Sequence, residues 1–212
     1  MSQTPNTMHY VIVLDRSGSM SGRMEDVVGA VNEQLTELRS TADETGKQCL
    51  VTLVRFDNDI ETVFDDQDVR SLTDLRMEDV QPRGSTSLID ATVTSIERTA
   101  ERTLAATIER TASVAMIVYT DGGENSSRLR NSDDLKRALA TYQDLPGWDI
   151  AFIGADPSAI HTMEHAGFDQ RKMAYVQAEN SHHAMRRMSS SLRDKMAYER
   201  EFNFGEDFED LK

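Results

Sequence analysis

The stretch VIVLDRSGSM at residues 11–20 decides the fold, because an apolar run ends abruptly in an aspartate followed by two serines. Residues 11–14 are apolar and mostly β-branched, which is typical of a strand buried on both faces. Asp15, Ser17 and Ser19 then place short oxygen-bearing side chains in the following loop. The stretch therefore predicts an inner strand with a polar loop at its carboxyl end.

Working outward, apolar runs alternate with segments of helical periodicity. Further strands are predicted at residues 50–56, 60–64, 114–119, 150–153 and 173–176. Helical spacing of apolar residues predicts helices at 24–38, 89–104, 132–142, 157–166 and 185–196. The Asp-Asn-Asp turn at residues 57–59 makes the strand at 60–64 an antiparallel edge strand.

This alternation predicts the α/β fold class: a Rossmann-like, doubly wound, mostly parallel six-stranded sheet with one antiparallel edge strand and helices on both faces. In such sheets, ligands bind outside the carboxyl ends of the strands. We expect one domain at residues 1–198 and a disordered acidic tail at 199–212, where acidic residues interleave with phenylalanines. Apolar residues at 185, 188, 192 and 196 form a stripe that predicts core contact for the closing helix.

Composition narrows the function. The 212 residues carry a formal net charge of −14, which disfavours binding to nucleic acid. No apolar run is long enough to cross a bilayer, so we expect no membrane association. The single cysteine, Cys49, excludes an internal disulfide framework and favours the cytoplasm. Cys49 itself has the sequence context of a small apolar strand residue.

Three loops concentrate short oxygen-bearing side chains at predicted strand ends or helix starts. They contain DRSGS at residues 15–19, GSTSL at 84–88 and TDGGENSS at 120–127. Asp15 and Asp121 each follow an apolar strand, and two neighbouring carboxylates would repel each other unless a cation lay between them. Hydroxyls from Ser17, Ser19 and Thr86 would add oxygen ligands without adding charge. The pattern predicts a site for a hard divalent cation.

DRSGS, Thr86 and Asp121, in this order, resemble the three parts of the metal-ion-dependent adhesion site of von Willebrand factor type A domains. The sequence is especially similar to stand-alone intracellular bacterial and phage members. The resemblance implies Mg²⁺, or Mn²⁺ in its place, contacted by Ser17, Ser19 and Thr86, with Asp15 and Asp121 acting partly through water. The acidic pair that forms a second cation site in integrin-type relatives is missing, so one metal is expected.

A metal held mainly by neutral hydroxyls keeps much of its charge and retains exchangeable positions. The resemblance therefore implies a protein-binding module, not an enzyme, in which an Asp or Glu of a partner protein completes the coordination, within a multiprotein assembly. Two alternatives stay open: a metal-dependent hydrolase that activates water with the same ion, and a structural adaptor with a vestigial site. The sequence does not determine the oligomeric state, and a shift of the closing helix on binding stays a further hypothesis.

Simpler local roles compete with the metal site. Ser19 or Ser21 could cap the first helix, and Ser85 or Thr86 the second. Glu124 has the context of a solvated loop residue. His161 and His165 stand one helical turn apart, which we interpret as two exposed side chains on a surface helix.

Overall fold

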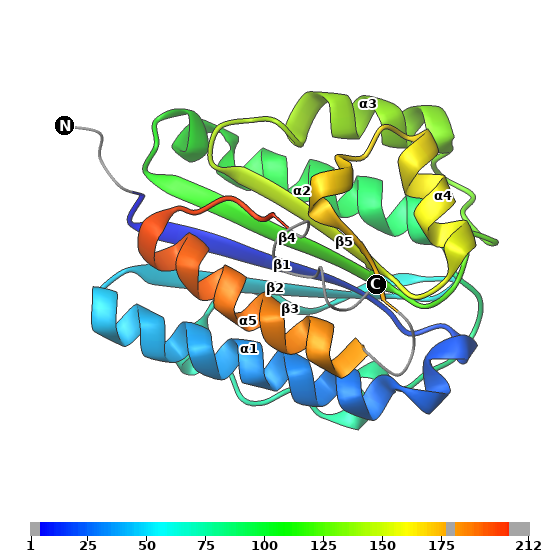
Figure 1. The fold of residues 1–212 in the computed structure, drawn as a ribbon, viewed down its shortest axis with the longest axis horizontal. Coiled ribbons are helices and arrows are strands. Elements are labelled where there is room, and N and C mark those ends of the chain that lie inside the picture. The colour runs from blue at the N-terminus through cyan, green and yellow to red at the C-terminus, as the bar shows by residue number, and fades with distance from the viewer. Residues whose placement is uncertain (1–4, 177–180, 204–212) are drawn as a thin grey trace.

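The structure is a computed structural model that describes residues 5–176 and 181–203. A central sheet is covered by helices on both faces (Figure 1). The strands are β1 (Thr7–Asp15), β2 (Gln48–Phe56), β3 (Ile60–Asp68), β4 (Ala112–Thr120), β5 (Trp148–Gly154) and β6 (Met173–Tyr175). The α-helices are α1 (Met24–Thr45), α2 (Leu88–Ile108), α3 (Ser132–Tyr142), α4 (Pro157–His165) and α5 (Ser181–Tyr198).

The six strands lie in the order β3-β2-β1-β4-β5-β6. β2 and β3 are antiparallel, and the other neighbouring strands are parallel. The predicted fold class is therefore confirmed, including the antiparallel edge strand. The chain leaves β1 toward β2 on one side and later returns to β4 on the other, so the topological switch point lies between β1 and β4.

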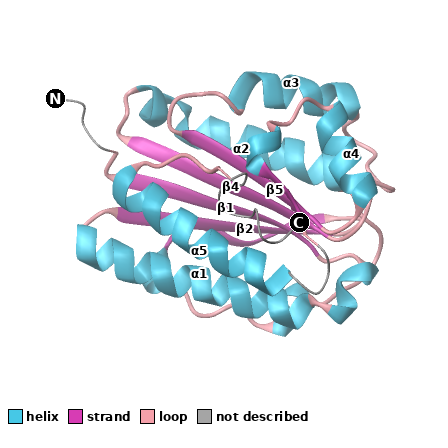
Figure 2. Ribbon diagram, viewed as in Figure 1, coloured by secondary structure: helices cyan, strands magenta, loops and turns pink. Residues whose placement is uncertain are grey.

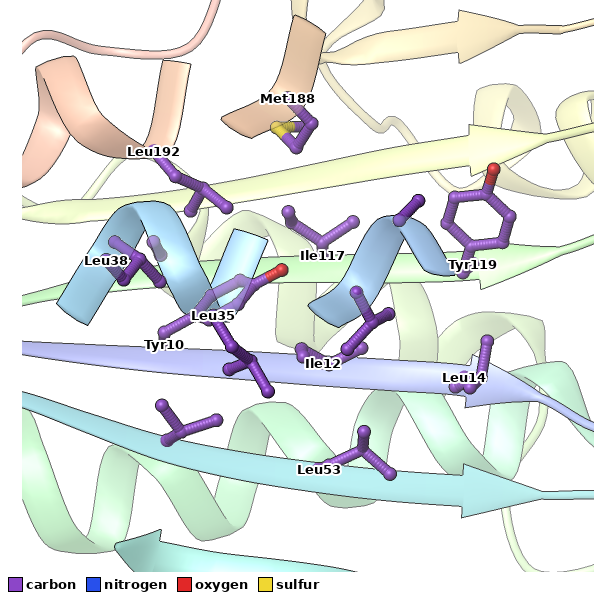
Figure 3. Packing of buried hydrophobic residues seen from close by; sticks show 14 of the residues in the cluster. Tyr10, Ile12, Leu14, Leu35, Leu38, Leu53, Ile117, Tyr119, Met188 and Leu192 are labelled. Carbon is purple, nitrogen blue, oxygen red and sulfur yellow. The ribbon is translucent and has the colours of Figure 1, made fainter. Parts of the chain in front are cut away.

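Alternation along β1 builds two cores. Tyr10, Ile12 and Leu14 point to the face covered by α1 and α5, while Val11 and Val13 point to the face covered by α2, α3 and α4. Figure 3 shows the first of these cores, in which side chains from β1, β2 and β4 meet those of α1 and α5. Burial on both faces explains why the inner strands are apolar without alternation.

The closing helix packs as its stripe predicts. Met188, Leu192 and Met196 are buried against α1 and the sheet, and the side chain of Met185 lies outside the described part of the chain. Phe202, beyond α5, is also buried in this core, whereas residues 204–212 of the expected tail lie outside the described residues. Cys49 is fully buried in β2, as its context predicts, and burial raises the pKa of its thiol.

An ion cluster lies inside this packing. Asp149 of β5 is 0% exposed, and its carboxylate contacts Lys172 Nζ at 2.7 Å and Lys195 Nζ of α5 at 2.5 Å. Both lysine side chains are also buried, 7% and 3% exposed. One carboxylate therefore faces two ammonium groups, and one of these comes from the closing helix.

The described residues also form four short 3₁₀ helices, which the periodicity does not predict. They are η1 (Gly18–Gly22), η2 (Val69–Ser71), η3 (Met77–Val80) and η4 (Gln170–Lys172). The first follows directly on the polar loop after β1, so this loop enters α1 through a tight turn. No helix among the described residues is both long and apolar enough to span a bilayer.

Candidate metal centre

The candidate site lies at the carboxyl ends of the central strands, where the following loops come together at one end of the sheet (Figure 2). Asp15 is the last residue of β1, and Thr120 is the last residue of the neighbouring strand β4. Asp121 follows Thr120 directly. The strand register therefore brings the two aspartates to the same edge, as the sequence pattern predicts.

Hydrogen bonds connect the predicted oxygen donors. Ser17 Oγ lies 2.9 Å from Ser19 Oγ, and Ser19 Oγ donates to Asp121 Oδ1 over 2.6 Å. These contacts join two loops that are separated by more than a hundred residues in the sequence. The hydroxyls thus contact each other and one carboxylate.

Thr86 and Asp15 meet this group around Gly122. A methyl group placed on Gly122 would lie 3.0 Å from Thr86 Oγ1, 3.3 Å from Ser19 Oγ and 3.8 Å from Asp15 Oδ2. The space beside Gly122, which belongs to the third loop, is therefore bounded by oxygens of the other two loops, and a side chain there would fill it. Ser19 connects these oxygens to Ser17 and Asp121, and the two carboxylates and three hydroxyls gathered in this way are a donor set that suits Mg²⁺ or Mn²⁺.

Asp15 is completely buried, at 0% exposure. Its carboxylate accepts hydrogen bonds from the backbone N–H of Ser17 at 2.6 Å and from Thr120 Oγ1 at 2.5 Å. Burial raises the pKa of Asp15 to about 6, the hydrogen bonds from Thr120 and Ser17 oppose the rise, and the negative charge of Asp121 adds to it. A cation beside Asp15 would offset the unfavourable charge.

Arg23 supplies a positive charge that the sequence did not single out. Its Nε lies 3.2 Å from Asp121 Oδ2, and the Asp121 side chain is only 3% exposed. The guanidinium therefore neutralises part of the acidic pair. Arg23 stands at the start of α1, and only the fold shows that it reaches the loop after β4.

A second charged cluster holds the loops around the site. Asp57, directly after β2, contacts Arg16 at 3.0 Å and Arg83 at 2.6 Å through its Oδ2. Arg16 is 3% exposed, and Glu61 of β3 is its second acidic partner, at 3.1 Å. Burial alone would raise the pKa of Asp57, yet the N–H of Asp59 and the two guanidinium groups hold it below its ordinary value.

Backbone hydrogen bonds reinforce this arrangement. Gly18 N donates to Gly84 O over 3.1 Å, which joins the loop after β1 to the loop before α2. Ser87 N donates to Asp57 O over 3.0 Å, so the turn after β2 is joined to the residue that follows Thr86. Arg16 directly follows Asp15, and Arg83 stands three residues before Thr86. Asp57, in the turn after β2, contacts both arginines and so can fix the two hydroxyl-bearing loops.

The capping interpretation of the serines and Thr86 is wrong. α1 begins after Arg23 and α2 after Ser87, and neither residue makes a side-chain capping bond. Ser21 Oγ instead donates to Gly18 O. The hydroxyls of the candidate site are therefore not used as caps for these helices.

Glu124 is not the solvated loop residue that the sequence suggested. It accepts hydrogen bonds from the backbone N–H of Ile89 at 2.8 Å, from Ser126 N at 3.0 Å and from Ser127 N at 2.8 Å. Glu124 thus caps the first turn of α2 from a loop far along the sequence. Propensity rules look for caps immediately before a helix, so they could not find it.

Within the described residues, no group of three or more His, Cys, Asp or Glu side chains is placed to hold a metal ion. The candidate centre does not form such a group, because only two of its oxygen donors are carboxylates and the others are hydroxyls. His161 and His165 are exposed on α4, as predicted, with ring centroids 3.8 Å apart and His165 Nδ1 directed at His161 O.

Solved structures with the same fold include proteins of several kinds. The PilB minor pilin from Streptococcus sanguinis superposes with a TM-score of 0.64 at 14% identity, over 92% of this chain and 62% of the pilin. The vWF domain of the type V pili tip protein Mfa5 from Porphyromonas gingivalis gives a TM-score of 0.58 at 11% identity, over 92% of this chain and 97% of that domain.

A third structure is proximal thread matrix protein 1 from the mussel byssus with a zinc-occupied MIDAS motif, at a TM-score of 0.56 and 13% identity, over 91% of this chain and 47% of that protein. The chain thus spans less than two thirds of the pilin and about half of the byssus protein. At these identities the likeness shows the fold alone, and no curated protein matches the sequence.

Family membership follows from the sequence match. Residues 10–202 match the model described as von Willebrand factor type A domain, which covers the whole of the described sheet from Tyr10 onward and extends to the buried Phe202. The family generally binds protein ligands. The chain belongs to the von Willebrand factor type A domain family.

Proposed function

We propose that this domain binds Mg²⁺, or Mn²⁺ in its place, at the candidate centre and uses it to capture a carboxylate of a partner protein. One observation carries the proposal: oxygens of Asp15, Ser19 and Thr86 line the space beside Gly122, and hydrogen bonds join Ser19 to Ser17 and Asp121. These residues would hold the ion. When bound, the ion supplies a positive charge with exchangeable positions that attracts an external carboxylate.

The residues around the ion have distinct parts in this proposal. Asp15 and Asp121 supply negative charge, and Thr120 orients Asp15 through the hydrogen bond to Oδ2. Thr86 is 2% exposed, and its Oγ1 makes no hydrogen bond with another described residue, so its lone pairs are free to face a cation. The byssus protein with zinc in its MIDAS motif shows that this fold can hold a divalent ion there.

We further propose binding without catalysis, in a cytoplasmic domain that works within an assembly. The buried, unpaired Cys49 supports a reducing compartment. The hydrolase alternative is tested by phosphoester and peptide turnover assays in Mg²⁺. Turnover that disappears in Thr86→Ala would replace the binding proposal by a catalytic one.

The decisive experiment is a Mg²⁺ titration in which the thermal stability of the domain is measured at each concentration. A ligand that binds only the folded state stabilises it by RT ln(1 + [L]/Kd), which is about 2.7 kcal/mol at a hundredfold excess over Kd. Wild type should gain stability, and Thr86→Val should lose most of that gain. Ser85→Ala is the matched control, because Ser85 lies in the same loop outside the centre. An equal Mg²⁺ response in wild type and Thr86→Val would contradict the assigned site.

A further inference from the structure

The loop at residues 121–131, between β4 and α3, is held by an unusual set of bonds. The carboxylate of Asp90, in the first turn of α2, accepts hydrogen bonds from three consecutive backbone N–H groups: Arg128 at 2.8 Å, Leu129 at 3.1 Å and Arg130 at 2.7 Å. Asp90 is 5% exposed, so water competes little for these bonds. The tip of the loop is therefore fixed to α2.

The preceding half of the loop is fixed as well. Thr86 O accepts hydrogen bonds from Asn125 N and Ser126 N, both at 3.1 Å, and Glu124 joins Ser127 to the start of α2. Because Thr86 is itself a residue of the candidate centre, the loop is attached directly to that centre. Its backbone is ordered before any partner arrives, which reduces the entropy lost on binding.

What the fixed tip presents to solvent is an apolar side chain beside a cation. Leu129 is 78% exposed, and Arg128 is exposed with no ion-pair partner among the described residues. Arg130 pairs instead with Glu97, at 2.5 Å. A free arginine is notable in a chain with a net charge of −14, where acidic partners abound.

The tip lies close to the metal centre. Asp90, in the first turn of α2, stands only four residues after Thr86, so at most about 14 Å of extended chain separates them. A peptide of a few extended residues, at roughly 3.3 Å each, can therefore contact both places at once.

We propose that the Arg128-Leu129 tip is a second contact surface for the partner, and that it recognises an acidic segment with an apolar residue close to the carboxylate bound by the metal. This inference rests on the proposed function and adds the chemistry of the partner. Leu129 would pack against the apolar side chain of the partner segment, and Arg128 would attract a second carboxylate of that segment.

A purely structural role for the loop explains only part of this arrangement. Capping of α2 accounts for Glu124 and for the bonds to Asp90, which involve backbone groups that any residue would supply. It does not account for a leucine and an unpaired arginine at the exposed positions. Single exposed leucines are common, so the inference depends on three features together: the fixed backbone of the loop, the Arg128 side chain without an ion-pair partner among the described residues, and the adjacent metal centre.

The test is selection from a displayed library of random peptides, bound in Mg²⁺ and eluted with EDTA. Wild type should enrich peptides that contain an acidic residue with an apolar residue a few positions away. A synthetic peptide from that selection should bind Leu129→Ser about tenfold or more weakly, the factor expected for losing a buried leucine contact. Arg128→Gln should weaken binding a few fold at low salt and less at high salt.

Ile108→Ser is the matched control, since Ile108 is 69% exposed at the opposite end of α2. It should bind the peptide as wild type does. Equal affinity of Leu129→Ser and Ile108→Ser would overturn the second surface while leaving the metal site intact. If no peptide is enriched in an EDTA-sensitive way, the proposed function itself fails, and this inference fails with it.

Discussion

Replacing Asp57 by asparagine should destabilise the domain by about 3 kcal/mol. Asp57 is the buried carboxylate that faces Arg16 at 3.0 Å and Arg83 at 2.6 Å. Asparagine keeps the size and a hydrogen-bond acceptor but removes the charge. Breaking one side of a buried ion pair typically costs 3–5 kcal/mol, because the other charge stays buried without compensation.

The structure places the expected loss at the lower end of that range. Arg16 is 3% exposed and cannot reach bulk water, yet Glu61 remains as a partner at 3.1 Å. Arg83 is 55% exposed and can turn into solvent, so it adds little to the loss. The loss of stability therefore comes mainly from the buried guanidinium of Arg16, whose charge Glu61 still partly neutralises.

Urea unfolding in EDTA measures this loss without a contribution from metal. Asp65→Asn is the control: Asp65 bonds to Arg102 at the surface, with side chains 58% and 44% exposed, so less than 1 kcal/mol is expected. Adding Arg16→Met to Asp57→Asn should recover part of the stability, because it removes the stranded charge. A loss for Asp57→Asn no larger than that for Asp65→Asn would refute the reasoning.

Three further predictions concern charge. Because Asp15 has a pKa of about 6 and must be ionised to bind a cation, Mg²⁺ should bind about fourfold more weakly at pH 5.5 than at pH 7 by calorimetry, and a flat profile would contradict this. Arg23→Gln removes the positive charge at 3.2 Å from Asp121 that would repel a cation, so Mg²⁺ should bind a few fold more tightly. Weaker binding would contradict this and show that Arg23 positions Asp121 for the ion. In urea unfolding, Asp149→Asn should lower the free energy of unfolding by about 3 kcal/mol or more, because two buried lysines lose their counter-ion. Lys195→Met should be nearly neutral, because one carboxylate and one ammonium group remain. Equal losses for the two variants would argue against a cluster with surplus positive charge.

The sequence predicts the sheet well because its signals are local. Four apolar runs mark β1, β2, β4 and β5, β1 and β4 end in the polar residues Asp15 and Thr120, and the turn at residues 57–59 marks the antiparallel strand. Since parallel strands end at one edge, the positions of Asp15 and Asp121 could be expected from strand assignment alone. Asn131, directly before α3, is likewise a local cap, and its side chain accepts hydrogen bonds from the backbone N–H groups of Asp133 and Asp134.

The supporting contacts were not predictable from the sequence, because their partners are distant in it. Arg16 and Asp57 follow different strands, β1 and β2, and charged residues are assigned to solvent unless the fold shows otherwise. Glu124 caps a helix that begins thirty-six residues earlier, at Leu88. Asp149 sits in the apolar run of β5, where only the packing of α5 reveals a lysine partner.

Gly122 has a practical consequence. Its backbone is not in the left-handed region, so alanine is permitted there, yet the added methyl would lie 3.0 Å from Thr86 Oγ1 and 3.3 Å from Ser19 Oγ. Gly122→Ala would therefore plug the centre with a single carbon while every oxygen donor stays in the chain. Such a blocked protein would serve as a decoy reagent, with the charge and surface of wild type but no room for an ion.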